Sequence, residues 1–180
     1  MPKPLFSGVC TALVTPFLDN KLNLPMVKVL LERQISAGIE AVVLGGTTGE
    51  ASTLSDEEKI ALFCTGKEYA KNDTKIIAGT GSNSTEHTIK LSIAAEKAGA
   101  DALLLVSPYY NKATAQGLIE HYTTIAKHVT IPIILYNVPS RTGVNIEPAT
   151  YAALAEHPMI QGIKEANGQI DKIVETMSLV

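Results

Sequence analysis

The sequence predicts an α/β protein with a (β/α)8 TIM barrel fold, of which residues 1–180 supply about the first six βα units. Short apolar runs rich in β-branched residues alternate with helical segments, and the repeat of roughly 30 residues matches one βαβ unit. The runs are apolar nearly throughout, as in parallel strands covered on both faces. Polar motifs follow these runs, at the strand ends where TIM barrels carry their active sites. The predicted strands lie at 8–17, 39–46, 75–81, 100–108, 132–139 and 160–166.

The segments between the strands show the spacing of amphipathic helices. Glycines in AGIE (37–40) and AGAD (98–101) are expected to stop a helix just before the next strand. The last helix begins near Gln169 and is still running at Val180. The apolar stripe of the first helix comprises Val27, Leu30, Leu31 and Ile35.

The second helix has the clearest start signal. Ser55 and Glu58 form a capping box, in which each side chain binds a backbone N–H of the other residue. Its predicted apolar stripe ends in a polar residue and comprises Ile60, Phe63, Cys64 and Lys67.

A doubly wound dinucleotide-binding sheet is the competing α/β architecture. It requires G-x-G-x-x-G after the first strand, whereas the nearest match, GTGSNS (79–84), follows the third strand and ends in Ser84. The sequence therefore favours the barrel. Because a closed barrel needs eight units and about 250 residues, we expect residues 1–180 to be a single catalytic domain that is truncated at its C-terminus.

Composition argues against several functional classes. The net charge of −3 is spread without blocks, which predicts neither a nucleic-acid partner nor an anionic membrane partner. No apolar run reaches the roughly 20 residues of a membrane span. Cys10 and Cys64 form no CxxC motif, so neither a disulfide framework nor a thiolate metal site is expected, and the start MPKPLFSGVC lacks an apolar signal core. A cytoplasmic, reduced protein is therefore expected. No metal is expected either: the histidines lack ligand spacing and are predicted to be solvated helix residues, namely His87, His121, His128 and His157.

Lys164, in QGIKEA (161–166), is unusual because a lysine is rarely placed in a buried strand. Strand alternation puts it on one face with the small residues Gly162 and Ala166. If that face is the barrel interior, desolvation lowers the pKa of the amine and creates a nucleophile for a carbonyl. The alternative is a lysine that extends out of the strand end into solvent.

Tyr136 lies on the preceding strand at the same predicted depth, being fifth from Pro132 as Lys164 is fifth from Ile160. Neighbouring strands are roughly 4.8 Å apart, so the two side chains are expected to meet. A phenol beside an imine-forming lysine can relay protons. The alternative is a core tyrosine whose hydroxyl is satisfied locally.

Three further motifs lie at strand ends. In GGTTGE (45–50), Thr47 and Thr48 offer hydroxyl and backbone donors to a carboxylate, unless this is an ordinary turn. Arg141, in a loop beyond Tyr136, suits bidentate carboxylate binding, although a loop arginine can equally be a solvated surface charge. The pair Tyr109–Tyr110 indicates a partner surface, a pocket rim or loop packing.

The motifs GGTTGE, SPYYNK, YNVPSRTG and GIKEA, in this order and spacing, resemble the dihydrodipicolinate synthase family of pyruvate-dependent class I aldolases and lyases. The resemblance implies that Lys164 forms a Schiff base with pyruvate. The resulting enamine attacks L-aspartate 4-semialdehyde and gives 4-hydroxy-tetrahydrodipicolinate, an intermediate of lysine and diaminopimelate biosynthesis. No cofactor is implied, because pyruvate is bound covalently through the lysine.

The resemblance also implies roles for the other residues. Tyr136, Thr47 and Tyr110 would form a proton relay, with Tyr110 reaching in from a neighbouring subunit of a dimer of dimers. Thr48 would hold the pyruvate carboxylate, and Arg141 would anchor the carboxylate of the semialdehyde. Two alternatives stay open: a related lyase that cleaves N-acetylneuraminate or keto-deoxy sugar acids, and an inactive barrel fragment.

Overall fold

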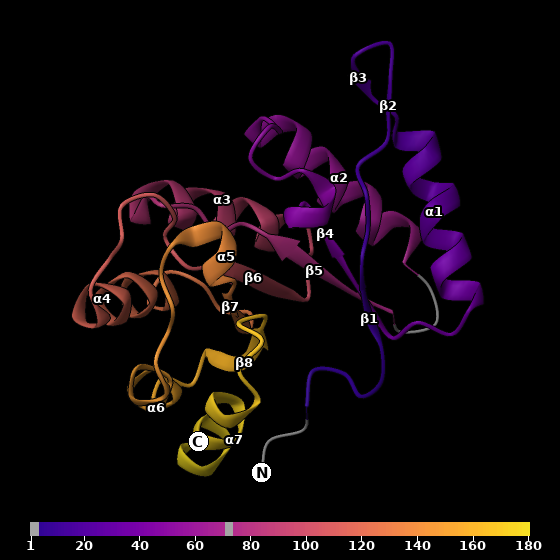
Figure 1. The fold of residues 1–180 in the computed structure, drawn as a ribbon. Coiled ribbons are helices and arrows are strands. Elements are labelled where there is room, and N and C mark those ends of the chain that lie inside the picture. The colour runs from indigo at the N-terminus through magenta and orange to yellow at the C-terminus, as the bar shows by residue number, and fades with distance from the viewer. Residues whose placement is uncertain (1–3, 71–73) are drawn as a thin grey trace. The chain divides into compact units, whose positions relative to one another are not determined.

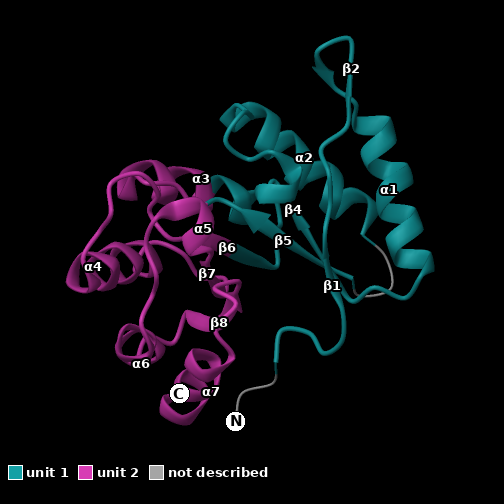
Figure 2. Ribbon diagram, viewed as in Figure 1, with its two compact units in different colours: residues 1–80, 94–103 teal, residues 81–93, 104–180 magenta. Residues whose placement is uncertain are grey.

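The structure is a computed structural model that describes residues 4–70 and 74–180. Six parallel-type strands alternate with helices along the chain (Figure 1), as the sequence predicts. They form one sheet in the order β1-β4-β5-β6-β7-β8. The chain divides into two compact units, residues 1–80 with 94–103 and residues 81–93 with 104–180 (Figure 2). The single-domain organisation predicted for residues 1–180 stays a prediction.

The first unit is built on three parallel strands, with β4 in register with both neighbours. β4 is buried along its whole length, because helices and neighbouring strands cover its apolar side chains. The elements are β1 (Cys10–Ala12), β2 (Phe17–Leu18), β3 (Lys21–Leu22), α1 (Leu24–Ser36), β4 (Ala41–Leu44), η1 (Thr47–Gly49), α2 (Asp56–Tyr69) and β5 (Lys75–Gly79).

The helix boundaries follow the predicted signals. Ser55 and Glu58 form both hydrogen bonds of the capping box that opens α2. Gly38 and Gly99 adopt left-handed backbone conformations, with φ of +77° and +91°. Only glycine adopts such conformations without a steric cost, so both helices stop where the sequence predicts.

The buried face of α2 is shifted by one residue along the helix from the predicted apolar stripe. Cys64 is exposed, and the face toward the core combines Leu62 and Phe63 with Lys59 and Gly66. Lys59 buries its aliphatic stem, and burial lowers the pKa of its amine while neighbouring Asp56 opposes that shift. A Cβ on Gly66 would collide with Leu44, so the strand packs directly on the helix backbone. Neither a lysine nor a glycine gives an apolar signal in the sequence.

The first predicted strand (8–17) is also shorter than expected. Only Cys10–Ala12 pairs in the large sheet, and Phe17–Leu18 pairs with Lys21–Leu22 in an antiparallel hairpin. Asp19 and Asn20 connect them with φ of +51° and +58°. Two consecutive left-handed residues match the hairpin turn that aspartate and asparagine favour.

The second unit contains the last two strands and most of the later helices. Two elements, α3 (Thr85–Lys97) and β6 (Ala102–Val106), contribute residues to both units. The other elements are α4 (Ala115–Ala126), β7 (Ile133–Asn137), α5 (Pro139–Thr142), α6 (Pro148–Ala155), β8 (Ile160–Glu165) and α7 (Ile170–Leu179). The last of these follows Gln169 directly, as predicted.

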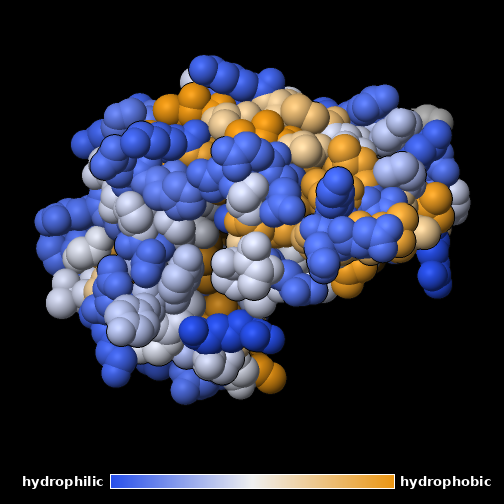
Figure 3. Space-filling view, turned by 90° about the horizontal axis from the view of Figure 1, so that it is seen from above, coloured by the Kyte–Doolittle hydropathy of each residue, from blue (hydrophilic) through white to orange (hydrophobic). Residues whose placement is uncertain are grey.

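β8 is less covered than the sequence predicts. It lies at the edge of the sheet, with Gln161 exposed and Ile163 37% exposed. Hydrophobic residues also reach the surface elsewhere, as the face in Figure 3 shows. On α7 the exposed ones are Ile170, Val174, Met177 and Leu179.

His121 contradicts the prediction that the histidines are solvated. It lies on α4 with 6% of its surface exposed, and its Nδ1 is 2.9 Å from the Thr85 hydroxyl. Its Nε2 is buried without a hydrogen-bond partner in the described chain. Burial lowers the pKa of His121 to about 4, so the ring is neutral at pH 7.

We predict that His121 makes stability depend on pH. Between its ordinary pKa of 6.5 and about 4, the unfolded chain binds a proton here that the folded chain does not. The free energy of unfolding is therefore lost as pH falls through this window, by about 3 kcal/mol at most. Urea unfolding of wild type and His121→Gln at pH 7.5 and pH 4.5 tests this. The variant should lose less stability on acidification, whereas the exposed-site control His128→Gln should match wild type. An equal loss in all three proteins would contradict the assignment.

Candidate functional site

Lys164 and Tyr136 lie at the centre of the candidate site. They are partners in the parallel ladder of β8 and β7, and the Lys164 amine lies 4.4 Å from the centroid of the Tyr136 ring. Tyr136 is 7% exposed and Lys164 is half-buried. The sequence therefore predicts this meeting of side chains correctly.

The register that brings them together contains an irregularity. Ile133 pairs with Ile160, but the next residue, Ile134, pairs with Gly162. Gln161 is thus an extra residue, as in a β-bulge. The predicted regular ladder, with Pro132 opposite Ile160, is wrong at its beginning, and the bulge restores the match further along the strand.

Backbone hydrogen bonds link the carboxyl end of β7 to the segments that follow β6 and β8. The N–H of Ser107 donates to the carbonyl of Tyr136 at 3.0 Å, and the N–H of Ala166 donates to the carbonyl of Asn137 at 2.9 Å. Both bonds lie within two residues of the Lys164–Tyr136 pair. The side chains therefore project from a backbone held on each side, which favours a fixed geometry for reaction.

The Lys164 amine is not held by an acid: none of the ion pairs found in residues 4–70 and 74–180 includes it. Its contact with the face of an aromatic ring is a cation–π arrangement when the amine is charged. Lys164 is half-buried on an edge strand of the sheet, between the two predicted alternatives of an interior lysine and a lysine that extends into solvent.

Arg141 lies in the short helix α5 rather than in the predicted loop. Its side chain is exposed. The buried hydroxyl of Thr142 donates to the carbonyls of Val138 and Val144, and Gly143 ends the helix with φ of +72°. Arg141 therefore presents an exposed side chain from a hydrogen-bonded turn that directly follows β7.

Thr47 and Thr48 belong to the first unit, where they form the short helix η1 after β4. Both side chains are exposed. A Cβ on Gly79 would collide with the backbone of Gly45, so a glycine there lets the GGTTGE loop approach β5 closely. Their predicted roles are not tested by this placement.

Tyr110 belongs to the second unit and is 89% exposed. Its φ of +71° is left-handed, which is uncommon for a bulky residue. Tyr109 beside it is half-buried, and its carbonyl accepts a hydrogen bond from the N–H of Asn111. A strained backbone that presents an aromatic ring to solvent is typical of a functional loop.

A family model described as the dihydrodipicolinate synthetase family matches residues 5–180. The chain belongs to this family. One relative, the 4-hydroxy-tetrahydrodipicolinate synthase of Acetivibrio thermocellus, is 49% identical over 179 residues, which cover 99% of this chain and 61% of the relative. The chain thus spans about three fifths of the length of the relatives that it matches.

Solved structures of the family share the fold. The chloride-inhibited dihydrodipicolinate synthase of Acinetobacter baumannii, complexed with pyruvate, is 46% identical with a TM-score of 0.92, covering 96% of this chain and 60% of that one. A monomeric dihydrodipicolinate synthase variant is 44% identical with a TM-score of 0.94, covering 97% of this chain and 59% of that one. The predicted fold is confirmed: this is a TIM barrel chain, represented by about its first six βα units.

The site also contains residues that the sequence analysis missed. Asn137 and Glu165 are the next pair in the ladder after Tyr136 and Lys164, and their side chains are joined by hydrogen bonds of 2.9 and 3.1 Å. The sequence contains the signal for this second pair, because the register that pairs Tyr136 with Lys164 also pairs the residues that follow them, Asn137 and Glu165.

Other features of the described chain lie apart from this site. A pocket of about 240 Å³ in the second unit is lined mainly by Leu135, Ala155, Ile160 and Ile163 and does not include Lys164. Residues 4–70 and 74–180 contain no cluster of three or more side chains suited to hold a metal ion. In the same ranges no helix is long and apolar enough to span a membrane.

Proposed function

We propose that the protein condenses pyruvate with L-aspartate 4-semialdehyde to 4-hydroxy-tetrahydrodipicolinate, and so acts as a lyase in lysine and diaminopimelate biosynthesis. The family membership and the named relatives support this reaction. The observation that carries it is the contact between an amine and a phenol at the carboxyl ends of adjacent parallel strands. Active sites of TIM barrels lie at this end.

Lys164 supplies the chemistry as a nucleophile. Its neutral amine attacks the keto carbon of pyruvate, and loss of water gives a protonated imine. The imine nitrogen accepts electrons when a methyl proton leaves, so an enamine forms without a metal or organic cofactor. The enamine carbon then attacks the semialdehyde aldehyde, and attack of the substrate amine on the imine carbon closes the ring and releases the lysine.

Proton transfers in these steps need a group beside the amine. In our proposal the Tyr136 hydroxyl takes this role, which the contact between its ring and the Lys164 amine supports. In our proposal Thr47 and Tyr110 complete the relay. Thr48 holds the pyruvate carboxylate, and Arg141 holds the carboxylate of the semialdehyde.

We further propose that the protein is cytoplasmic and assembles as a dimer of dimers, in which Tyr110 serves a neighbouring subunit. The exposed, left-handed Tyr110 supports a partner surface at this loop. Because a monomeric dihydrodipicolinate synthase variant is known, the number of subunits in this protein has to be measured directly.

The substrates can be tested by offering the purified protein two reactions. Pyruvate with L-aspartate 4-semialdehyde should give product, whereas N-acetylneuraminate and keto-deoxy sugar acids should not be cleaved. Cleavage of a sugar acid at the higher rate would replace the proposed function with that of a related lyase.

Lys164→Ala should abolish the covalent labelling that borohydride produces in the presence of pyruvate, because the imine can no longer form. Intact mass spectrometry measures the label. The matched control Lys172→Ala removes another half-buried lysine of the second unit and should be labelled like wild type. Full labelling of Lys164→Ala would remove Lys164 from the nucleophile role.

Arg141→Ala should weaken use of the semialdehyde by about ten- to a hundredfold in kcat/KM, the range expected when a charged hydrogen bond is lost. Formation of the pyruvate imine should change little, because pyruvate is held elsewhere. Steady-state kinetics and borohydride trapping separate the two effects. Lys112→Ala, which removes an exposed cation from a different loop, is the control. Equal losses in both assays would argue against a carboxylate anchor.

Tyr110→Ala should shift the assembly toward smaller species, since it removes a large aromatic side chain from the proposed subunit contact. Sedimentation velocity at several concentrations measures this. Tyr69→Ala, at a half-buried tyrosine of α2, should sediment like wild type. A wild-type monomer with full activity would contradict the shared relay.

A further inference from the structure

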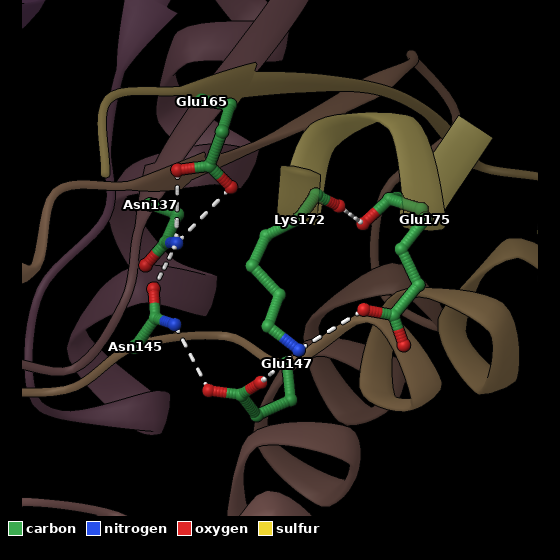
Figure 4. A network of polar contacts seen from close by, with 7 residues as sticks. Asn137, Asn145, Glu147, Glu165, Lys172 and Glu175 are labelled. Atoms are coloured by element: carbon green, nitrogen blue, oxygen red, sulfur yellow. Dashed lines mark hydrogen bonds and ion pairs between the residues drawn. The ribbon is translucent and has the colours of Figure 1, made fainter. Parts of the chain in front are cut away.

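Asn137 on β7 and Glu165 on β8 form one end of a chain of polar contacts that continues through Asn145 and Glu147 to Lys172 (Figure 4). They follow Tyr136 and Lys164 directly and are paired in the same ladder. Since successive side chains of a strand point to opposite faces, this pair projects from the face opposite the reacting side chains. The two pairs therefore share one register.

The Glu165 carboxylate accepts hydrogen bonds from several neutral donors. The Asn137 amide lies 2.9 and 3.1 Å from its two oxygens, the Tyr151 hydroxyl donates at 2.8 Å, and the N–H of Asn167 donates at 2.9 Å. None of the ion pairs in the described ranges includes Glu165. Hydrogen bonds to a charged group are stronger than those between neutral groups.

These donors come from three parts of the second unit. Asn137 belongs to β7 and is completely buried, Tyr151 belongs to α6 and is 2% exposed, and Asn167 follows β8. The Asn137 amide also lies 2.8 Å from the side-chain oxygen of Asn145, and its own oxygen accepts from the N–H of Ile146. The Glu165 carboxylate thus connects both strands, α6 and the segment after β8, and the Asn137 side chain extends the network to the segment at Asn145 and Ile146.

The bulge at Gln161 shows why this connection matters for the reaction. The ladder before the bulge would, if continued, put a different residue opposite Tyr136. A slip by one residue turns every side chain of a strand to the other face. The Asn137–Glu165 contact lies beyond the bulge and next to Lys164, so it holds the part of β8 that presents the amine.

We propose that Glu165 is a positioning residue: its carboxylate, held by Asn137 and Tyr151, locks β8 in the register that places Lys164 against Tyr136. This inference rests on the proposed function, in which Lys164 is the nucleophile. Glu165 acts through the backbone from the opposite face, so it takes no part in proton transfer.

The test compares Glu165→Gln with a matched control in the same network. Glutamine keeps the size of the side chain but removes the charge and one acceptor. Glu147→Gln makes the same change at an exposed acid whose side chain binds Asn145 and Lys172, neither of which lies on β7 or β8. Each protein is first shown to be folded by circular dichroism at the assay temperature.

Two measurements are made on each protein. The first is NMR detection of backbone contacts between Tyr136 and Lys164, which reports the register. The second is the rate of borohydride-trapped labelling by pyruvate. Glu165→Gln should weaken or lose the contacts and slow labelling by about tenfold or more, because displacement by about 1 Å can cost about a hundredfold in rate. Glu165→Asp, which keeps the charge, should recover part of the rate.

Glu147→Gln should retain both the contacts and the labelling rate. If Glu165→Gln lowers only the melting temperature and leaves the contacts and the rate unchanged, Glu165 is a structural brace and the inference is wrong. If Glu165→Gln does not fold, Tyr151→Phe replaces it, since it removes a single donor. That variant should slow labelling in the same direction, and a wild-type rate would overturn the inference.

The outcomes also separate this inference from the proposed function. If wild type is not labelled at Lys164, the proposed function fails, and the NMR contacts still decide whether Glu165 sets the register. If wild type is labelled and the Glu165→Gln contacts are unchanged, only the positioning role fails.

Discussion

The pairing of β7 with β8 is the constraint on which the site depends. An amine meets a phenol here because two parallel strands are held in one particular register, and that register is not continuous along the ladder. Lys164 and Tyr136 lie on different strands, and the pairing of those strands brings them together. Their contact is therefore a property of strand alignment rather than of side-chain choice alone, and the polar network on the reverse face shows how the alignment is held.

The network also illustrates how a partly buried charge is accommodated. Glu165 has no cation partner in the described ion pairs, yet both carboxylate oxygens receive donors from groups that are themselves buried. The same arrangement raises the pKa of Tyr151, because burial and the nearby carboxylate both oppose ionisation of the phenol. Tyr151 therefore stays a donor at any physiological pH.

Most of the fold could be predicted because its signals are local. The capping box at Ser55 and the stops at Gly38 and Gly99 act within a few residues and appear where expected. The six apolar runs each contain a strand of the large sheet, although the first strand is shorter than predicted. The errors arose where distant residues decide. Cys64 faces outward because Gly66 lets Leu44 pack on the helix. His121 is buried by tertiary packing, and its hydrogen-bond partner Thr85 is distant in the sequence.

The candidate site shows the same division. The meeting of Lys164 with Tyr136 follows from strand period and matched depth, whereas the bulge at Gln161 and the contacts of Glu165 depend on tertiary packing. The bulge has a consequence for chain length. Gln161 is surplus to the ladder, so a deletion at that position could be absorbed by straightening the strand, with the amine still facing its phenol. The same deletion at Ile163 lies beyond the bulge, so with the bulge in place it would turn Lys164 and Glu165 to opposite faces of the strand. Tolerance to indels within one short strand should thus change sharply over two positions.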